Sequence, residues 1–415
     1  MRIMLIDHYA GSERLGMEFR PYYMAREWLK AGNEVVIVAA SFTHLRKINP
    51  QVENDFDEQE IDGIRYVWVK TPEYHGNNAG RGVNILTFVR KLGRSAARLA
   101  EKYRPEAVIS SSTCPLDIRP AAKIARRAGA GLFFEIHDLW PLTPMELGHL
   151  SKWNPMIMAL QSAENYAYKH SKKIISILPD ADKYVRLRGY DDSKVVYVPN
   201  GVFACDIDLK EANSPQVETL RRLHSQGRFL VGYTGNHSVS NALEYFIDAS
   251  ALLQKEQVTI VLVGGGNYKD TLVRHVRENG CENVLFLDPV PKSEMGALLA
   301  ELDAAYMGLA KSNLFKYGVS PNKLFDYLLA AKPIIYAVEA SNDPVRDAGC
   351  GVSVPVGDCE AIARAVRSLI AAGPQGRAEL GRRGREYVLQ NHEYGALARR
   401  YAQALEPGAQ AKKGE

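Results

Sequence analysis

A short segment in the last third of the chain, Ser320–Asp326, combines a predicted helix start with charged side chains. Pro321 suits the first turn of a helix, because the N–H that proline lacks would have no partner there. The residue pattern predicts a helix over Asn322–Ala331. The amides and the positive dipole end of such a helix favour a phosphate group. Lys323 adds a positive charge beside them, and Asp326, one turn later, can accept hydrogen bonds from hydroxyl groups.

The same residues also fit an ordinary helix with a lysine in solvent, and for a lone Ser-Pro-x-Lys sequence that is the commoner case. Three consecutive glycines raise a similar choice. Gly264, Gly265 and Gly266 follow an apolar run and would let a ligand approach the backbone closely. A tight turn explains these glycines equally well.

Polar residues follow apolar runs in the first half of the chain too. His137 and Asp138 come directly after Gly131–Ile136, and crevice residues of a parallel sheet lie at such strand ends. The alternative is a structural histidine in a turn rich in Trp and Pro. Asp138 fits either role.

The loop after the first predicted strand holds Gly16, and a helix start with Glu18 and Arg20 follows it. Glu18 and Arg20 could contact a substrate. They also fit a helix end in solvent.

These residues need parallel sheets to position them. The first half alternates apolar runs with helical stretches, which predicts β-α-β units and a parallel sheet. The predicted strands are 1–7, 34–40, 63–69, 107–110, 131–136, 173–177 and 194–198, and the clearest helices are 20–31, 84–103 and 117–128. The expected architecture is a doubly wound α/β domain.

A second α/β series begins near Arg228. Its predicted strands are 229–234, 258–263, 283–287, 304–308, 333–337 and 351–354, with helices between most of them. The polar segment Cys205–Ser214 is the candidate linker between the halves. The tail Gly408–Glu415 is predicted to be disordered.

The composition agrees with two globular domains. A chain of 415 residues is too long for one core. The net charge of +4 argues against a general nucleic-acid binder. The five cysteines show no paired or zinc-ligand spacing, which is typical of a reducing compartment. We find no cluster with metal-ligand spacing, no signal-peptide pattern and no apolar run long enough to span a membrane, so we predict a cytoplasmic protein.

Five stretches together resemble one enzyme family. They are GMEFRPYYMAREWLKAGNEVVIVAASFTHLR (16–46), EIHDLWPLTPMELG (135–148), VVYVPNGV (195–202), YTGNHSVSNALE (233–244) and GVSPNKLFDYLLAAKPII (318–335). The family is the retaining glycosyltransferases of family 4, in particular the branch of O-antigen or N-acetylfucosamine transferases. The resemblance spans nearly the whole chain, in the family's order.

The resemblance implies the GT-B fold, in which two Rossmann-like doubly wound domains face each other across a cleft. It implies a first, acceptor-binding domain over residues 1–204 and a second, donor-binding domain over residues 205–385. A C-terminal helix at 386–407 is expected to cross back to the first domain, and its residues Tyr394, Leu397 and Tyr401 would share one face.

The resemblance also assigns roles in donor binding. Ser320, Asn322 and Leu324 would hold the donor diphosphate together with Lys323, and Asp326 stands where the family usually has a Glu that grips the ribose. A second family Glu, which contacts the transferred sugar, is replaced by Gly318. We expect the backbone N–H groups of Gly318 and Val319 to serve instead.

Many relatives also clamp the phosphates with an Arg and a Lys after the first strand of the second domain. This chain has Gly235 and Asn236 there, so Lys323 would be the main positive charge. The resemblance places the nucleobase at Val290. Gly264 and Gly265 are donor-binding candidates because they follow a strand.

In the first domain, the resemblance implies that Gly16 leaves room for donor phosphates and acceptor. His137 would face the donor sugar, with Asp138 as a second catalytic candidate. Glu18 and Arg20 are expected on the acceptor side.

The predicted activity is transfer of a sugar from a nucleotide-diphosphate sugar to a lipid-linked or glycan acceptor in surface polysaccharide synthesis. The resemblance gives UDP-linked donors as the default and implies no metal cofactor. Peripheral contact with the inner membrane is predicted through the basic helix Arg90–Arg104. Residues 145–167 are a second candidate, for membrane contact or an acceptor pocket, although core packing also explains their pattern.

Three alternatives remain from the sequence. Gly318 and the missing Arg/Lys clamp would suit a non-catalytic sugar-nucleotide-binding subunit. A nucleotide-sugar epimerase would share the fold class. A dinucleotide oxidoreductase is disfavoured, because the loop Gly11–Gly16 lacks G-x-G-x-x-G spacing.

Overall fold

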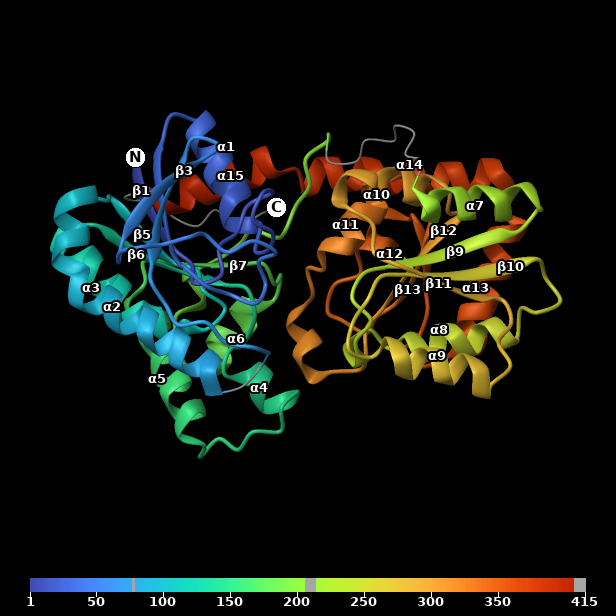
Figure 1. Cartoon of the computed structure of the whole chain (residues 1–415), viewed down its shortest axis with the longest axis horizontal. Helices are drawn as coiled ribbons and strands as arrows, with labels where there is room; N and C mark the ends of the chain where they lie inside the picture. Colours follow the sequence, from blue (N-terminus) through green and yellow to red (C-terminus); the bar gives the residue numbers. More distant parts are fainter. Residues whose placement is uncertain (77–78, 206–213, 407–415) are drawn as a thin grey trace. The chain divides into compact units, whose positions relative to one another are not determined.

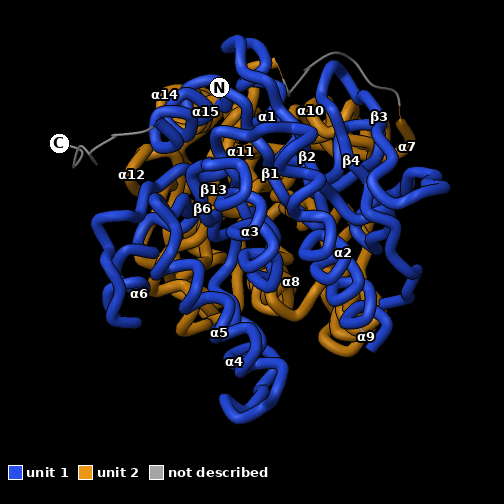
Figure 2. The backbone as a smooth tube through the Cα atoms, turned by 90° about the vertical axis from the view of Figure 1, so that its left-hand side faces the viewer, with its two compact units in different colours: residues 1–200, 394–415 blue, residues 201–393 orange. Residues whose placement is uncertain are grey.

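The structure, a computed structural model, describes residues 1–76, 79–205 and 214–406. They form two compact units (Figures 1 and 2). Unit 1 combines Met1–Asn200 with the C-terminal segment that begins at Tyr394, and unit 2 is Gly201–Glu393. The predicted linker lies, apart from its two end residues, outside the described residues, as does the predicted tail Gly408–Glu415.

Unit 1 contains an eight-stranded sheet in the order β3-β4-β2-β1-β5-β6-β7-β8. Its strands are β1 (Arg2–Ile6), β2 (Glu34–Ala40), β3 (Asp57–Ile61), β4 (Ile64–Val69), β5 (Ala107–Ser110), β6 (Gly131–Ile136), β7 (Lys173–Ser176) and β8 (Val195–Tyr197). The central strands are buried along almost their whole length, because helices cover both faces of the sheet.

The helices of unit 1 lie in two layers. They are α1 (Arg20–Lys30), α2 (Ala79–Tyr103), α3 (Ile118–Ala128), α4 (Leu142–Glu146), α5 (Pro155–His170), α6 (Ala181–Leu187) and α15 (Tyr394–Leu405), with short 3-10 turns at Pro115–Asp117 and Asp192–Lys194. The helices α2, α3 and α5 contact one another or the sheet on one face, and α1 and α15 pack together on the other (Figure 1).

One strand departs from the prediction of a parallel sheet. β3 pairs antiparallel with β4 at the edge of the sheet. Its sequence DEQEI is mostly polar and therefore gives little strand signal. The connecting residues Asp62 and Gly63 both have positive φ, and Asp-Gly between two short strands is a frequent hairpin turn. That dipeptide could have revealed the hairpin.

Unit 2 contains a six-stranded parallel sheet in the order β11-β10-β9-β12-β13-β14. Its strands are β9 (Phe229–Thr234), β10 (Val258–Val263), β11 (Val284–Leu287), β12 (Ala304–Gly308), β13 (Ile334–Ala337) and β14 (Gly351–Ser353). All six lie where the sequence predicts strands, with ends that differ by at most one residue.

Two hydrophobic cores sandwich this sheet. Helices α7 (Pro215–Ser225), α10 (Lys292–Ala300), α11 (Asn322–Leu329) and α14 (Gly373–Asn391) contribute to one, and α8 (Leu243–Ala251), α9 (Lys269–Glu278) and α13 (Cys359–Ala371) to the other (Figure 1). The remaining elements are α12 (Pro344–Ala348) and the 3-10 turns Val239–Asn241 and Asn313–Tyr317.

The predicted final helix is two helices, so that prediction is wrong in its extent. α14 ends at Asn391 and α15 begins at Tyr394. Between them the chain pairs with Val202, whose N–H donates to His392 O at 2.9 Å. Val388 is buried in a core of unit 2, which explains why the first part of the predicted helix belongs to unit 2.

The second of these helices, α15, belongs to unit 1 and packs against α1. Tyr394, Leu397 and Tyr401 are buried on one face of it, as the spacing predicts. On α1, Trp28 Nε1 donates a hydrogen bond to Ala398 O at 3.0 Å.

Candidate functional site

Each sheet has one position where the strand order reverses. In unit 1, β1 lies between β2 and β5, and in unit 2, β9 lies between β10 and β12. Ligands of open α/β sheets bind outside the carboxyl ends of the strands at such a point. Most of the predicted site residues follow β6, β9 or β10 or lie at the start of α11, whereas Gly16, Glu18 and Arg20 lie at or just before the start of α1 and Val290 follows β11. Each unit has its own group of polar side chains near this point of its sheet.

The group in unit 2 is the Lys323 cluster, formed by Tyr233, Asn236, Asn241 and Lys323. Lys323 Nζ donates hydrogen bonds to Tyr233 Oη at 2.7 Å and to Asn241 Oδ1 at 2.9 Å. Tyr233 Oη in turn donates to Asn236 O at 2.8 Å, and Asn241 Nδ2 donates to the same oxygen at 2.9 Å. The ammonium group is thereby held at the carboxyl end of β9.

The first turn of α11 carries this lysine. Tyr327, one turn further along α11, accepts a hydrogen bond from Thr234 N at 2.8 Å, which fixes α11 to the end of β9. No side chain caps α11 in the described part of the chain. Burial lowers the pKa of Lys323 to about 8. A nearby anion would oppose this shift, because it favours the charged form.

The remaining predicted residues of this segment lie around the same helix start. Ser320 is buried, Asn322 is exposed as the first residue of α11, and Leu324 is a core residue whose N–H donates to Pro321 O. Asp326 is half-buried. Its contact with a ribose stays a prediction.

The proposed substitutes for the missing family Glu are already used inside unit 2. Gly318 N donates to Phe315 O at 2.9 Å, and Val319 N donates to Asn342 Oδ1 at 2.9 Å. Asn342 Nδ2 also donates to Val319 O at 3.0 Å. The expectation that these two N–H groups contact the sugar is therefore wrong for this structure.

The glycines after β9 and β10 fall into two kinds. A methyl group on Gly264 would lie 2.0 Å from Gly235 O, and Gly264 has a φ of +146°. Gly235 also has a positive φ, and the Lys323 side chain passes 3.3 Å from its methyl position. Close packing between the two loops therefore explains Gly264. A methyl group on Gly265 would meet only Pro289 Cγ, at the ordinary van der Waals distance of 3.8 Å, so there is room for a methyl group at Gly265.

Val290 follows β11 and is half-buried against a core of unit 2. Its contact with a nucleobase stays a prediction.

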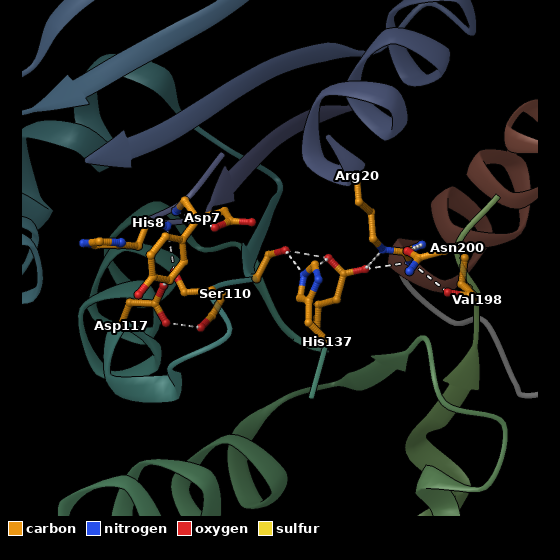
Figure 3. A network of polar contacts seen from close by, with 12 residues as sticks. Asp7, His8, Arg20, Ser110, Asp117, His137, Val198 and Asn200 are labelled. Atoms are coloured by element: carbon orange, nitrogen blue, oxygen red, sulfur yellow. Dashed lines mark hydrogen bonds and ion pairs between the residues drawn. The ribbon is translucent and has the colours of Figure 1, made fainter. Parts of the chain in front are cut away.

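The group in unit 1 is the His137 network, formed by Asp7, Asp117, Glu135, His137 and the serines beside them (Figure 3). His137 Nε2 lies 2.9 Å from Ser111 Oγ and 3.4 Å from Glu135 Oε2. Burial opposes protonation of His137, but the Glu135 carboxylate outweighs it and raises the pKa of the imidazole. A contact between His137 and a donor sugar would use Nδ1, because Nε2 is engaged.

Arg20 is the clearest correction among the predicted site residues. Its side chain is 2% exposed, and its guanidinium forms an ion pair with Glu135 at 2.9 Å. The same group donates to the carbonyl oxygens of Pro199 and Val198 at 2.6 and 2.8 Å. The guanidinium is thus neither in solvent nor directed to an acceptor. It keeps Glu135 ionised: burial opposes the charge, but Arg20 lowers the pKa of Glu135 to about 2.

Two further buried carboxyl groups flank His137. Burial raises the pKa of Asp7 to about 7, and burial likewise raises that of Asp117 to about 7. Asp117 accepts hydrogen bonds from Ser110 Oγ at 2.7 Å and Ser112 Oγ at 2.5 Å. Glu18 is half-buried, and its charge contributes to the raised pKa values of Asp7 and His137, which places it near this network.

Asp138 and Gly16 have local structural roles. Asp138 Oδ1 accepts hydrogen bonds from Leu139 N at 2.9 Å and Thr143 Oγ1 at 2.7 Å, which shapes the turn into α4. A methyl group on Gly16 would lie 2.8 Å from Lys47 N, so the close approach of the Lys47 backbone explains this glycine, and a ligand beside Gly16 stays a prediction.

The sequence did not single out several of these residues. Glu135 lies inside an otherwise apolar buried strand, and a charge in such a strand signals a buried partner. Asp7 directly follows β1 at the point where the strand order reverses. The pattern gave no signal for Asp117, Tyr233 or Asn241 as site residues.

Two residues of the predicted basic helix Arg90–Arg104 contact other side chains of unit 1. Lys102 forms an ion pair with Glu58, and Arg98 stacks on the ring of Phe56 at 5.3 Å. Arg90 and Arg94 are exposed. Within the described ranges, no helix is both long and apolar enough to cross a membrane.

Two protein families match the chain, one in each half. Residues 16–201 match the family described as "Glycosyl transferase 4-like domain", and residues 228–372 match "Glycosyl transferases group 1". A curated relative, the probable glycosyltransferase WbjE of Pseudomonas aeruginosa, is 22% identical over 275 residues, which are 65% of this chain and 68% of that protein.

Solved glycosyltransferases share the fold. The Anabaena protein Alr3699/HepE, in complex with UDP and glucose, superposes with a TM-score of 0.67 at 16% identity, over 98% of this chain and 99% of HepE. WaaG, a glycosyltransferase involved in lipopolysaccharide biosynthesis, gives 0.65 at 14% identity, over 98% of this chain and 100% of WaaG. Sucrose-phosphate synthase of Thermosynechococcus elongatus gives 0.70 at 17% identity, over 97% of each chain.

Proposed function

Since this chain belongs to the glycosyltransferases of family 4, which have the GT-B fold, we propose that it transfers a sugar from a nucleotide-diphosphate sugar, with UDP as the nucleotide. The anomeric configuration is retained in the proposed reaction. The acceptor is a lipid-linked or glycan intermediate of a surface polysaccharide, such as an O-antigen, lipopolysaccharide or capsule.

The Lys323 cluster is the observation that carries this proposal. An ammonium group, the start of a helix and the carboxyl end of β9 coincide at the reversal point of the sheet in unit 2. Each of these features favours an anion, and together they suit a diphosphate.

The same features suit the chemistry. The bond from the sugar to the diphosphate breaks, and negative charge grows on the leaving nucleotide. A positive charge and backbone dipoles that are already in place stabilise that charge without reorganising. Lys323 and the first turn of α11 supply both, so the proposed reaction is metal-independent.

Two relatives support the finer parts of the proposal. HepE was solved with UDP and glucose, which supports UDP as the nucleotide here. WaaG is involved in lipopolysaccharide biosynthesis, and together with the similarity to WbjE this supports a polysaccharide acceptor. We place the protein in the cytoplasm, in peripheral contact with the inner membrane.

The His137 network takes a second role in the proposal. His137 carries a raised pKa beside an ionised Glu135 and can donate a hydrogen bond to an oxygen of the bound donor. Asp138 shapes the turn that follows His137. Retention does not require a pair of carboxylates flanking the sugar, because the family resemblance implies attack from the face of the leaving group.

The experiment is a thermal-shift comparison of UDP, GDP and ADP, followed by turnover of the matching nucleotide sugar. A ligand that binds only the folded state raises its stability by RT ln(1 + [L]/Kd). We expect UDP to give the largest shift, and UDP-sugar to release UDP when a lipid extract supplies the acceptor. Stabilisation by none of the three nucleotides would refute the proposal, and a larger shift with GDP or ADP would correct the base.

A further inference from the structure

One part of unit 1 projects from the rest. The helix α4, the connection that follows it and the start of α5 extend beyond the body of unit 1 in two perpendicular views (Figures 1 and 2). Within this part, we call the connection after α4 and the start of α5, residues Leu147–Met158, the α4–α5 lobe.

Large apolar side chains lie exposed on this lobe. They are Leu147, Trp153, Met156 and Met158, and Trp153 is 73% exposed. The neighbouring first turns of α2 expose Val83 and Leu86. Soluble proteins rarely gather large apolar side chains in one exposed region unless that region binds something.

The exposed residues stand on an ordered support. Ile157 and Leu160 of α5 are buried in a small core with Cys114, and Ile85 of α2 and Leu150 of the lobe pack against it. Asn154 Oδ1 accepts a hydrogen bond from Met156 N at 2.9 Å and so fixes the start of α5. Core packing therefore uses one face of residues 145–167 and leaves the other face apolar in solvent.

Among the exposed charges named around the lobe, basic residues outnumber acidic ones. Between Leu147 and His170 the only acidic residue is Glu164, which is buried. Lys152 is exposed, and its Nζ lies 5.2 Å from the ring centre of Trp153. The helix α2 has no acidic residue before Glu101, and Arg90, near its middle, is exposed. Glu146, at the end of α4, is the acidic residue that borders the lobe.

We propose that the α4–α5 lobe is the surface with which this protein docks on an anionic lipid membrane. Trp153 and the exposed Leu and Met side chains enter the interface between headgroups and acyl chains, where Trp is favoured. Lys152 and Arg90 face the anionic headgroups. An exposed Trp153 beside Lys152, on an apolar face where the named cations outnumber Glu146, selects this occupant over a second protein surface.

This inference deepens the proposed function, because a lipid-linked acceptor lies in such a membrane. It also moves the contact away from the C-terminal half of α2, where Arg98 and Lys102 are engaged within unit 1. The predicted basic helix contributes its first half only.

The test measures co-sedimentation of the full chain with vesicles of phosphatidylglycerol and phosphatidylcholine in equal parts, and with phosphatidylcholine alone. We expect at least about tenfold tighter binding to the anionic vesicles, since each basic residue near the surface adds about 1 kcal/mol. The double variant Leu147→Ser/Trp153→Ser should lose at least about tenfold in affinity for them. Leu187→Ser is the matched control, because Leu187 is 72% exposed on α6, outside the lobe.

Tryptophan emission gives a second readout. Trp28 and Trp68 are buried and Trp140 is half-buried, so Trp153 dominates any change on docking. Anionic vesicles should shift the emission of the natural protein to the blue, and the shift should vanish in Trp153→Phe.

Absence of vesicle binding, or equal binding by the double variant and Leu187→Ser, would overturn the inference. Self-association that the double variant abolishes, without vesicle binding, would assign the lobe to a second copy and overturn it as well. The nucleotide shift separates the two proposals: the double variant should keep the UDP shift of the natural protein. If UDP shifts neither protein, the proposed function fails while the vesicle result stands.

Discussion

Buried charge is used in two different ways at the scale of single residues. In unit 1, Arg20 and Glu135 neutralise each other, so both remain charged inside the protein. In unit 2, Lys323 donates hydrogen bonds to the uncharged side chains of Tyr233 and Asn241, and burial lowers its pKa to about 8. An unneutralised buried ammonium is suited to an incoming anion, whereas a neutralised guanidinium is suited to holding a fold.

Asp7 permits a prediction about pH. Burial raises its pKa from 3.8 to about 7 in the folded protein. Between these two values the folded state binds more protons than the unfolded state, so stability falls as pH rises towards 7. Asp7→Asn removes this dependence. Between about pH 5 and pH 8, we expect the free energy of unfolding to fall by about 2 kcal/mol less in the variant than in the natural protein.

Urea unfolding at both pH values checks this expectation. Glu60→Gln, an exposed substitution on β3, is the control and should behave like the natural protein. An equal loss of stability in Asp7→Asn and the natural protein would mean that Asp7 does not titrate as a buried acid.

The sequence identified the chemistry of single residues better than their surroundings. Lys323 could be singled out because proline, a helix start and a lysine occur within a few residues. Arg20 was misplaced because a charged residue at a helix start is usually solvated, and its partner Glu135 is 115 residues away. Pairing across such a distance leaves no local pattern.

At the scale of elements, the loops after the strands decide what can bind. The loops after β9 and β10 touch through their backbones at Gly235 and Gly264, and this contact shapes the carboxyl edge of the sheet. Gly265, next in the chain, has room for a methyl group, which would touch only Pro289 Cγ. Backbone packing therefore requires glycine at position 264 and does not require it at position 265.

These glycines give a matched pair of variants. Gly264→Ala places a methyl group against the Gly235 carbonyl at a positive φ, and should cost about 3 kcal/mol or more. Gly265→Ala should leave stability within about 0.5 kcal/mol and weaken nucleotide binding if a ligand occupies that space. Chemical denaturation and UDP titration of both variants measure these effects. Equal stabilities would show that the backbone contact at Gly264 relaxes at little cost.

Apolar periodicity predicted the elements well wherever burial is two-sided. The six strands of unit 2 are short apolar runs because helices cover both faces of the sheet. The pattern did not predict β3, because an edge strand can be polar. The pattern did not predict the break between α14 and α15, because the residues on both sides of it are helical. The chain pairs there with Val202, which is far away in the sequence.

At the scale of the whole molecule, the chain repeats one architectural solution. Both units are sheets whose strand order reverses next to the first strand, and both gather polar side chains at that point. The sequence predicted this tandem architecture from the alternation of strands and helices, and the family matches to residues 16–201 and 228–372 agree with it. The central proposal is that the start of α11 in unit 2 binds the donor.

The most direct test is a calorimetric titration of UDP into the natural protein and Lys323→Ala. Removing a charge-assisted contact to phosphate should weaken binding at least about tenfold. Lys255→Ala, just before the amino end of β10, and Arg94→Ala in unit 1 should bind UDP as the natural protein does. If Lys323→Ala binds UDP with unchanged affinity, the nucleotide diphosphate does not sit at the start of α11, and the proposed donor site is wrong.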